Sequence, residues 1–219
     1  MEIDVNYLFE ILISGFGMSV QIFFITLIGA LPLGVVVALC RMSKFKPLAL
    51  VARLYISVLR GTPLMLQLMA WMFIPYYAFG LSMGPDWKMT ACSIGFILNY
   101  SAYFGEIYRS GIQSIPRGQY EAGQVLGYTS AQTFIFIVLP QVIKRIVPAM
   151  GNEIIALVKD TSLAFVLGVA EMFTEAKALA AKYVSMVPYF LAAAIYWIFT
   201  FAVELALNFV EKKLSYYHD

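Results

Sequence analysis

Two carboxylates within a long apolar stretch are the side chains best suited to chemistry in this sequence. Glu153 and Asp160 are seven residues apart, so a helix would place both on one face across two turns. A charged group inside a hydrophobic segment is costly and commonly marks a ligand or ion pathway. A carboxylate attracts an ammonium group far more strongly away from water than in it. The pair favours binding of a cationic or zwitterionic small molecule. The competing interpretation is a buried ion pair of Glu153 with Lys159 or with a basic residue of a partner subunit.

Other polar side chains interrupt the apolar segments. An amide at membrane depth needs a partner, either a neighbouring helix or a ligand. The candidate substrate-binding residues are therefore Asn99, Glu153, Asp160 and Gln67. Glycine and proline in an Arg-Gly-Thr-Pro run predict a broken helix at which a gate would hinge, and a Lys-Asp-Thr-Ser run predicts a second local break. The gating or structural candidates are Arg60, Gly61, Thr62, Pro63 and Lys159.

A polar run of helical length, from about Arg117 to Leu126, lies between two apolar segments. Gly127 follows it, and glycine readily adopts the left-handed conformation that ends helices. Short amphipathic helices commonly dock in grooves of partner proteins. Gly123 weakens such a helix by about 1 kcal/mol relative to alanine, so contact with a partner is expected to compensate. The candidate contact residues are Tyr120, Glu121, Ala122, Gly123, Leu126 and Gly127.

Composition excludes most soluble and catalytic classes. Of 219 residues, 61% are hydrophobic and 13% are charged, which places the chain in a lipid bilayer. The single histidine, His218, cannot form a metal set or a catalytic dyad with another histidine. Gly118 and Gly123 have the glycine spacing of a phosphate-binding loop, but Gln124 stands where that loop requires lysine. The chain is therefore not expected to be an enzyme, to hold a cofactor or to bind nucleic acid.

Five segments are long and apolar enough to cross a membrane. They are Ile11–Cys40, Leu54–Gly80, Met89–Tyr108, Val147–Phe173 and Val187–Phe209. An odd number places the two ends on opposite sides. Lysine and arginine concentrate in the linkers on one side, and this bias predicts a cytoplasmic C-terminus and an external N-terminus. Glu106 and Arg109, three residues apart, are expected to pair near the cytoplasmic boundary.

Two motifs give the chain a family resemblance. Residues 60–68, which include Arg60-Gly61-Thr62-Pro63 and Gln67, resemble the R-G-T-P-L-x-x-Q-L pattern of permease subunits of type I ATP-binding cassette importers, in the polar amino acid branch. Residues 121–140 resemble the E-A-A-x3-G-x9-I-x-L-P pattern of their cytoplasmic coupling loop. Gly123 departs from that pattern, which usually has alanine there. The polar residues 152–153 and 159–162 also resemble this family.

The resemblance implies an all-α membrane protein with five transmembrane helices and the type I importer permease fold. It implies a single transmembrane domain over residues 1–219, with a coupling loop at about 113–140, in the bacterial cytoplasmic (inner) membrane. The implied partners are a second permease copy or paralogue, two cytoplasmic subunits that bind ATP and magnesium, and an extracytoplasmic solute-binding protein. The expected function is import of polar amino acids by alternating access. Ser82–Lys88 and a charged outer loop containing Glu171, Glu175, Lys177 and Lys182, whose charges are expected to be solvated, would form the external docking surface.

Two other functions remain open at this point. An ion-coupled secondary carrier would use Glu153, Asp160 and Glu204 as coupling sites. A non-transport scaffold or channel subunit would use the polar face for subunit packing. The sequence also leaves open which amino acid is carried and whether the two permease copies are identical.

Overall fold

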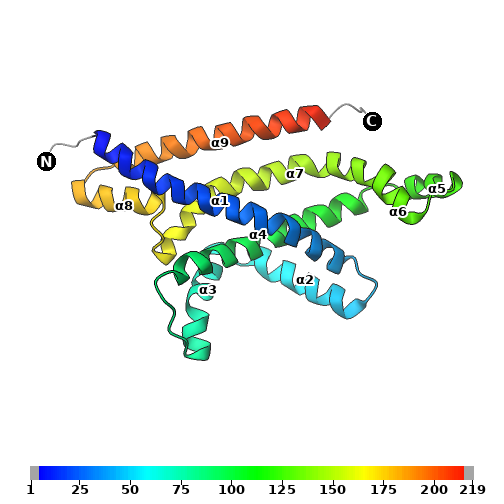
Figure 1. Ribbon diagram of the computed structural model, residues 1–219, viewed down its shortest axis with the longest axis horizontal. Helices are drawn as coiled ribbons and strands as arrows, with labels where there is room; N and C mark the ends of the chain where they lie inside the picture. Colours follow the sequence, from blue (N-terminus) through cyan, green and yellow to red (C-terminus); the bar gives the residue numbers. More distant parts are fainter. Residues whose placement is uncertain (1–4, 215–219) are drawn as a thin grey trace.

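The computed structural model describes residues 5–214, and every element in that range is helical. The elements in chain order are α1 (Val5–Arg41), α2 (Lys46–Gly61), α3 (Leu64–Phe79), α4 (Trp87–Gln113), α5 (Arg117–Val125), α6 (Ser130–Thr133), the π-helix η1 (Phe134–Val138), α7 (Leu139–Asp160), the 3-10 helix η2 (Thr161–Leu167), α8 (Met172–Tyr183) and α9 (Val187–Leu214). Figure 1 shows α5 and α6 at one end of an elongated bundle and α8 at the other. We call these the α5 end and the α8 end. His218 lies outside the described residues.

Three helical stretches of the described chain are long and apolar enough to cross a membrane: Val5–Arg41, Ser130–Leu167 and Val187–Leu214. The second of these includes α6, η1, α7 and η2 in succession. Helices α2 and α3 together would supply a fourth crossing, but they are bent by 111° at the break between them. The predicted span Leu54–Gly80 therefore consists of two helical pieces with a sharp bend between them. The predicted span Val147–Phe173 is wrong at its end, because Phe173 lies in α8.

The break between α2 and α3 follows from Thr62 and Pro63. Proline lacks a backbone N–H and disfavours the helical conformation of the residue before it, and Thr62 is accordingly extended, with φ −120° and ψ 149°. Pro63 then precedes α3 as its N-cap. The break predicted from the Arg-Gly-Thr-Pro run is confirmed, whereas its function as a hinge stays a prediction. Figure 1 shows α3 leaving the bundle at a steep angle to α2.

Helix α4 lies at the centre of the bundle, where it contacts α1, α2, α3, α7 and η2. Its 27 residues give a length of about 40 Å, enough to cross a bilayer, although α4 is not among the helices that are apolar enough by composition. Neighbouring helices cover its polar residues Asn99 and Ser101, which are 4% and 0% exposed. The neighbouring helices thus shield the polar residues of α4.

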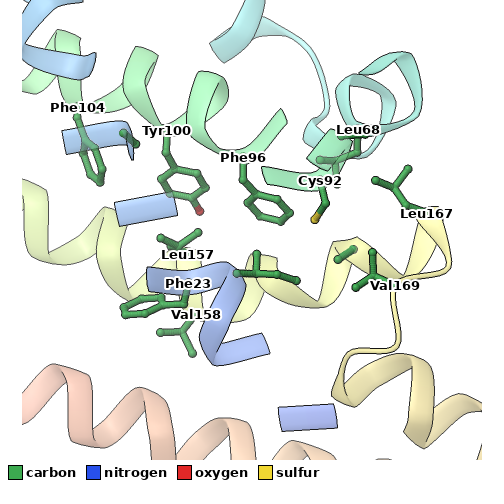
Figure 2. Close-up of a cluster of buried hydrophobic side chains, with 14 of the residues drawn as sticks. Phe23, Leu68, Cys92, Phe96, Tyr100, Phe104, Leu157, Val158, Leu167 and Val169 are labelled. Atoms are coloured by element: carbon green, nitrogen blue, oxygen red, sulfur yellow. The ribbon is translucent and has the colours of Figure 1, made fainter. Parts of the chain in front are cut away.

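The main hydrophobic core joins α1, α3, α4, α7 and η2. Phe96, Tyr100 and Phe104 recur every four residues on α4 and form a buried aromatic row, with ring centroids 6.5 Å and 6.0 Å apart. Figure 2 shows this row facing Leu157 of α7 and Phe23 of α1. The row fixes the angular position of α4, and therefore the direction in which the remaining polar face of that helix points.

Glycines allow α1 and α4 to approach closely. A Cβ atom at Gly34 would lie 2.9 Å from Cβ of Phe104, and one at Gly105 would lie 3.2 Å from the carbonyl oxygen of Gly34. Small residues are the usual means by which membrane helices pack, because lipid provides no hydrophobic drive between helices. The α1–α4 contact is therefore the one that a larger side chain would disturb most directly.

Candidate functional site

Helices α5 and α6 form a compact knob at the α5 end of the bundle (Figure 1). Helix α5 ends where the sequence predicts, because Gly127 has a positive φ of 78° and the N–H of Tyr128 donates to the carbonyl of Gly123 at 3.0 Å. Helix α6 begins with a capping box, in which the Thr129 hydroxyl accepts from the N–H of Gln132. These caps satisfy the backbone groups on both sides of the short turn between α5 and α6.

Gly123 is buried inside the knob. A Cβ atom at this position would lie 2.6 Å and 2.7 Å from the side-chain atoms of Thr133 on α6. Glycine therefore stands where the family pattern has alanine because α6 packs directly against α5. Contact with a partner stays a prediction, whereas the close approach of Thr133 gives a reason for glycine within the chain itself.

The outer surface of the knob carries exposed apolar side chains. Val125 is 88% exposed and Leu126 is 72% exposed, at the end of a helix whose other face is packed. Glu121 and Ala122 are also exposed. Tyr120 instead packs on the small cluster of Ile115, Val138 and Val142 at the base of the knob. Sequence reasoning missed Val125, although an apolar pair at the end of a polar helix was a usable signal.

Polar side chains from α2, α4 and α7 meet around Tyr100 and Tyr103, and we call this set of residues the polar face. The Tyr100 hydroxyl donates to Oδ2 of Asp160 at 2.8 Å. The Arg60 guanidinium lies 5.0 Å from the centre of the Tyr103 ring. Glu153 lies on α7 two helical turns before Asp160, on the same face of that helix. The structure thus brings the predicted residues Arg60, Glu153 and Asp160 onto one face with one cation and two carboxylates.

A groove of about 580 Å³ opens beside this face toward the α5 end. Arg60 and Glu106 line it from α2 and α4, and Arg145 lines it from α7. Glu106 forms the predicted ion pair with Arg109. Ala149, at one end of this groove, is one helical turn before Glu153 on α7, so the groove lies next to the polar face. A small polar molecule would meet charges of both signs along this route.

Lys159 does not neutralise Glu153. Within residues 5–214 no ion pair joins them, and the Lys159 side chain is exposed beside Ser162 and α9. The predicted break at Lys159–Ser162 is confirmed, because α7 ends at Asp160 and continues as the 3-10 helix η2. Lys159 and Asp160 are consecutive residues of α7 and therefore point in different directions, and Asp160 accepts its hydrogen bond from Tyr100.

Gln67 and Asn99 donate hydrogen bonds to backbone carbonyls at the break between α2 and α3. Nε2 of Gln67 donates to the carbonyl oxygens of Leu59 and Thr62, at 2.9 Å and 3.1 Å. Nδ2 of Asn99 donates to the same Leu59 carbonyl at 3.0 Å and to Oε1 of Gln67 at 2.9 Å. The amides thus satisfy carbonyls that the broken helix leaves without partners. This geometry favours a structural role, and substrate contact by either amide stays a prediction without support from these contacts.

The carboxylate of Glu171 is fully buried, which contradicts the expectation of a solvated charge in an outer loop. It is the N-cap of α8 and accepts from the N–H groups of Phe173 and Thr174, both at 2.7 Å. The available signal was its position: an acidic residue directly before a helix, with Thr174 three residues later. Charge alone is a poor guide to exposure where a helix N-terminus can supply donors.

The chain is similar to a known protein family and to individual transport proteins. The family described as "Binding-protein-dependent transport system inner membrane component" matches residues 30–216. The L-cystine transport system permease protein TcyB of Bacillus subtilis is 38% identical over 212 residues, covering 94% of this chain and 88% of that protein. The arginine transport system permease protein ArtQ of the same organism is 35% identical over 205 residues, covering 93% and 92%.

Two solved structures share the fold. An amino acid ATP-binding cassette transporter crystallised with histidines matches with a TM-score of 0.86 and 35% identity, covering 97% of this chain and all of that one. An inward-facing methionine transporter, MetNI, matches with a TM-score of 0.70 at 16% identity, covering 97% of this chain, and at that identity the likeness concerns the fold alone.

Proposed function

The chain belongs to the family of inner membrane components of binding-protein-dependent transport systems, and from that premise we propose that it is the permease subunit of an ATP-binding cassette importer for polar amino acids. The observation that carries the proposal is the knob of α5 and α6, a capped helix pair at one end of the bundle that presents Val125 and Leu126 outward. Such a projection is suited to a groove on a separate motor subunit. ATP and magnesium would then be bound in trans.

The proposed topology has five crossings, with the α5 end in the cytoplasm. Helices α2 and α3 together count as one broken crossing, and α4 supplies the central one. Lysine and arginine at the α5 end support this orientation, since positive residues favour the cytoplasmic side; they include Arg41, Lys44, Lys46, Arg117 and Arg145. The external solute-binding protein would dock at the α8 end, on α8 and Ser82–Lys88.

The proposed substrate is an amino acid that carries both charges. Arg60 suits an α-carboxylate, and Glu153 with Asp160 suits an ammonium group, because ion pairs strengthen away from bulk water. Relatives named for cystine and arginine transport support this class. Lys159, exposed beside the polar face, is retained as a gating candidate. A second permease copy would enclose the face from the other side.

Transport would proceed by alternating access. Closure of two ATP-bound motor subunits moves the knobs, and the helices switch between inward-open and outward-open states. Shifting a two-state equilibrium from 1:99 to 99:1 requires about 5.5 kcal/mol of differential affinity. Nucleotide binding by partner subunits is sufficient for this, so the permease itself needs no chemical step.

Reconstitution tests the proposed function. Vesicles that contain this chain, its motor subunits and a solute-binding protein are expected to accumulate radiolabelled L-cystine, L-arginine or L-glutamine only when ATP is inside the compartment that holds the motor subunits. Vesicles with the permease chain alone are the control and should accumulate none. ATP-independent accumulation by the chain alone would identify a secondary carrier or a channel and overturn the proposal.

Glu153→Gln is expected to reduce uptake by about tenfold or more, because hydrogen bonds to charged groups contribute about 1.5–3 kcal/mol and the neutral amide loses the ion pair with a substrate ammonium. Uptake kinetics in the reconstituted vesicles measure this loss. Glu211→Gln, the same change at an exposed position on α9, is the matched control. Co-purification of the motor subunits with both variants checks assembly, and wild-type uptake by Glu153→Gln would remove this residue from the substrate site.

A further inference from the structure

Glu171 ties three helices together at the α8 end. Its side chain is 0% exposed and caps the N-terminus of α8 through the N–H groups of Phe173 and Thr174. The Thr174 hydroxyl donates to the same carboxylate at 2.9 Å. Beyond α8, Oε2 accepts from the Tyr196 hydroxyl of α9 at 3.2 Å and from the Ser19 hydroxyl of α1 at 3.5 Å. A capping residue needs only the local bonds, so the contacts to α1 and α9 require another explanation.

The choice of glutamate at this position supports a role beyond capping. Aspartate, asparagine and serine are the preferred N-cap side chains because a short side chain reaches the first free N–H groups of its own helix. The longer glutamate side chain satisfies the same groups and also reaches Tyr196. Since a buried charge that loses a donor is strongly destabilised, α8 and α9 cannot separate at this point without a substantial cost.

The contacts continue from Glu171 to the polar face. Tyr196 also lines one pocket together with Lys159 and Ser162, the residues on either side of Asp160 and Thr161. Thr161 is the first residue of η2 and directly follows Asp160. Asp160 in turn accepts the hydrogen bond from Tyr100. Tyr196 therefore lies between the N-terminus of α8 and the chain segment that carries Asp160, the carboxylate that the proposed function assigns to the substrate.

We propose that Glu171 is a positioning residue that links α8, the proposed docking surface of the solute-binding protein, to the Asp160 end of the substrate face through Tyr196. The inference rests on the proposed function, because it requires a docking event at the α8 end. When α8 is displaced by docking, the Glu171–Tyr196 contact carries the displacement to α9 and to the α7–η2 junction. Basal turnover of the motor subunits does not depend on this contact, whereas its stimulation by the binding protein does.

The variant Glu171→Asp tests the contact with Tyr196 separately from the capping of α8. Aspartate keeps the local acceptor for the α8 N–H groups but is one methylene too short for Tyr196. In the reconstituted complex, the factor by which substrate-loaded binding protein stimulates ATP hydrolysis is expected to fall about tenfold, the size expected when a buried charged group loses one hydrogen-bond donor. Tyr196→Phe, which removes the hydroxyl and leaves the cap intact, should give the same loss. The double variant should be no worse than either single variant, because both remove one contact.

Glu10→Gln is the matched control, since Glu10 is an exposed carboxylate on α1 outside the network, and its stimulation factor should equal that of the wild type. The thermal midpoint of each purified complex is measured in parallel. Normal stimulation in Glu171→Asp and Tyr196→Phe would overturn the inference, as would a loss of basal and stimulated rates together with a lowered midpoint. The proposed function is tested separately, by ATP-dependent uptake of the wild-type complex. A failure of the proposed function and a failure of the proposed role of Glu171 would therefore appear in different measurements.

Discussion

Alanine at both Val125 and Leu126 is expected to reduce import by roughly 30-fold or more. These two side chains are the most exposed apolar groups of the knob. Burial of a valine or leucine side chain contributes about 1.5–3 kcal/mol, so truncation of both should weaken contact with the motor subunit by about 2 kcal/mol or more, which corresponds to roughly 30-fold in affinity. Uptake in reconstituted vesicles and co-purification of the motor subunits measure the effect.

The fold of the knob should survive this change. Its own packing uses the other face, where Gly123 meets Thr133 and Tyr120 meets Ile115. Phe45→Ala is the matched control, because Phe45 is 65% exposed on the connector between α1 and α2, outside the knob. If the Val125 and Leu126 variant kept its motor subunits and its import while Phe45→Ala lost them, the docking surface would lie on that connector instead.

Gly34→Val is expected to prevent stable assembly of the bundle. The new Cβ would lie 2.9 Å from Cβ of Phe104 and 3.2 Å from the backbone nitrogen of Gly105, so helices rather than a flexible side-chain end would have to move. Overpacking of a well-packed interior costs about 1–3 kcal/mol, and the upper part of that range is expected where backbone obstructs the new group. The fraction of monodisperse protein extracted from membranes, and its thermal midpoint, measure the loss.

Gly17→Val on the same helix provides the comparison. A Cβ at Gly17 meets nothing within 4 Å, so valine there should be tolerated, and the residual difference in helix propensity is shared by both variants. Equal loss at Gly17 and Gly34 would show that helix propensity of α1, not its contact with α4, sets the stability of the bundle.

The glycines of α1 illustrate how far sequence reasoning reached. Gly29, Pro32 and Gly34 in one apolar segment resemble helix breakers, yet α1 is continuous over 37 residues. Gly29 and Gly34 instead leave space for the side chains of Ile97 and Phe104 of α4 to pack against α1. Glycines that break a helix and glycines that let another helix pack closely look the same in the sequence. Only the position of the neighbouring helix distinguishes the two roles. The same ambiguity explains Gly123, whose partner Thr133 is ten residues away in sequence.

The roles of the buried polar residues were equally ambiguous in the sequence. Gln67 and Asn99 were expected near a substrate, but carbonyls freed by Pro63 occupy their amides. Glu171 was expected in water, but donors from α8, α1 and α9 surround it. The type of a polar side chain predicts that it needs partners. It does not predict whether those partners are ligand, solvent or a distant part of the same chain.

The sequence by itself determined the properties that depend on composition and on short spacing: residence in a membrane, the helix from Arg117 that ends before Gly127, the breaks at Pro63 and after Asp160, and the family. These follow from local conformational preference and from the free energy of transferring residues into lipid, which neighbouring residues in the chain decide. Only the tertiary structure decided that α4 is central, that α3 turns away by 111° and that Glu171 joins α1, α8 and α9. Those features depend on contacts between residues distant in the chain, such as Gly34 with Phe104 and Ser19 with Glu171, whose free energy no local pattern encodes.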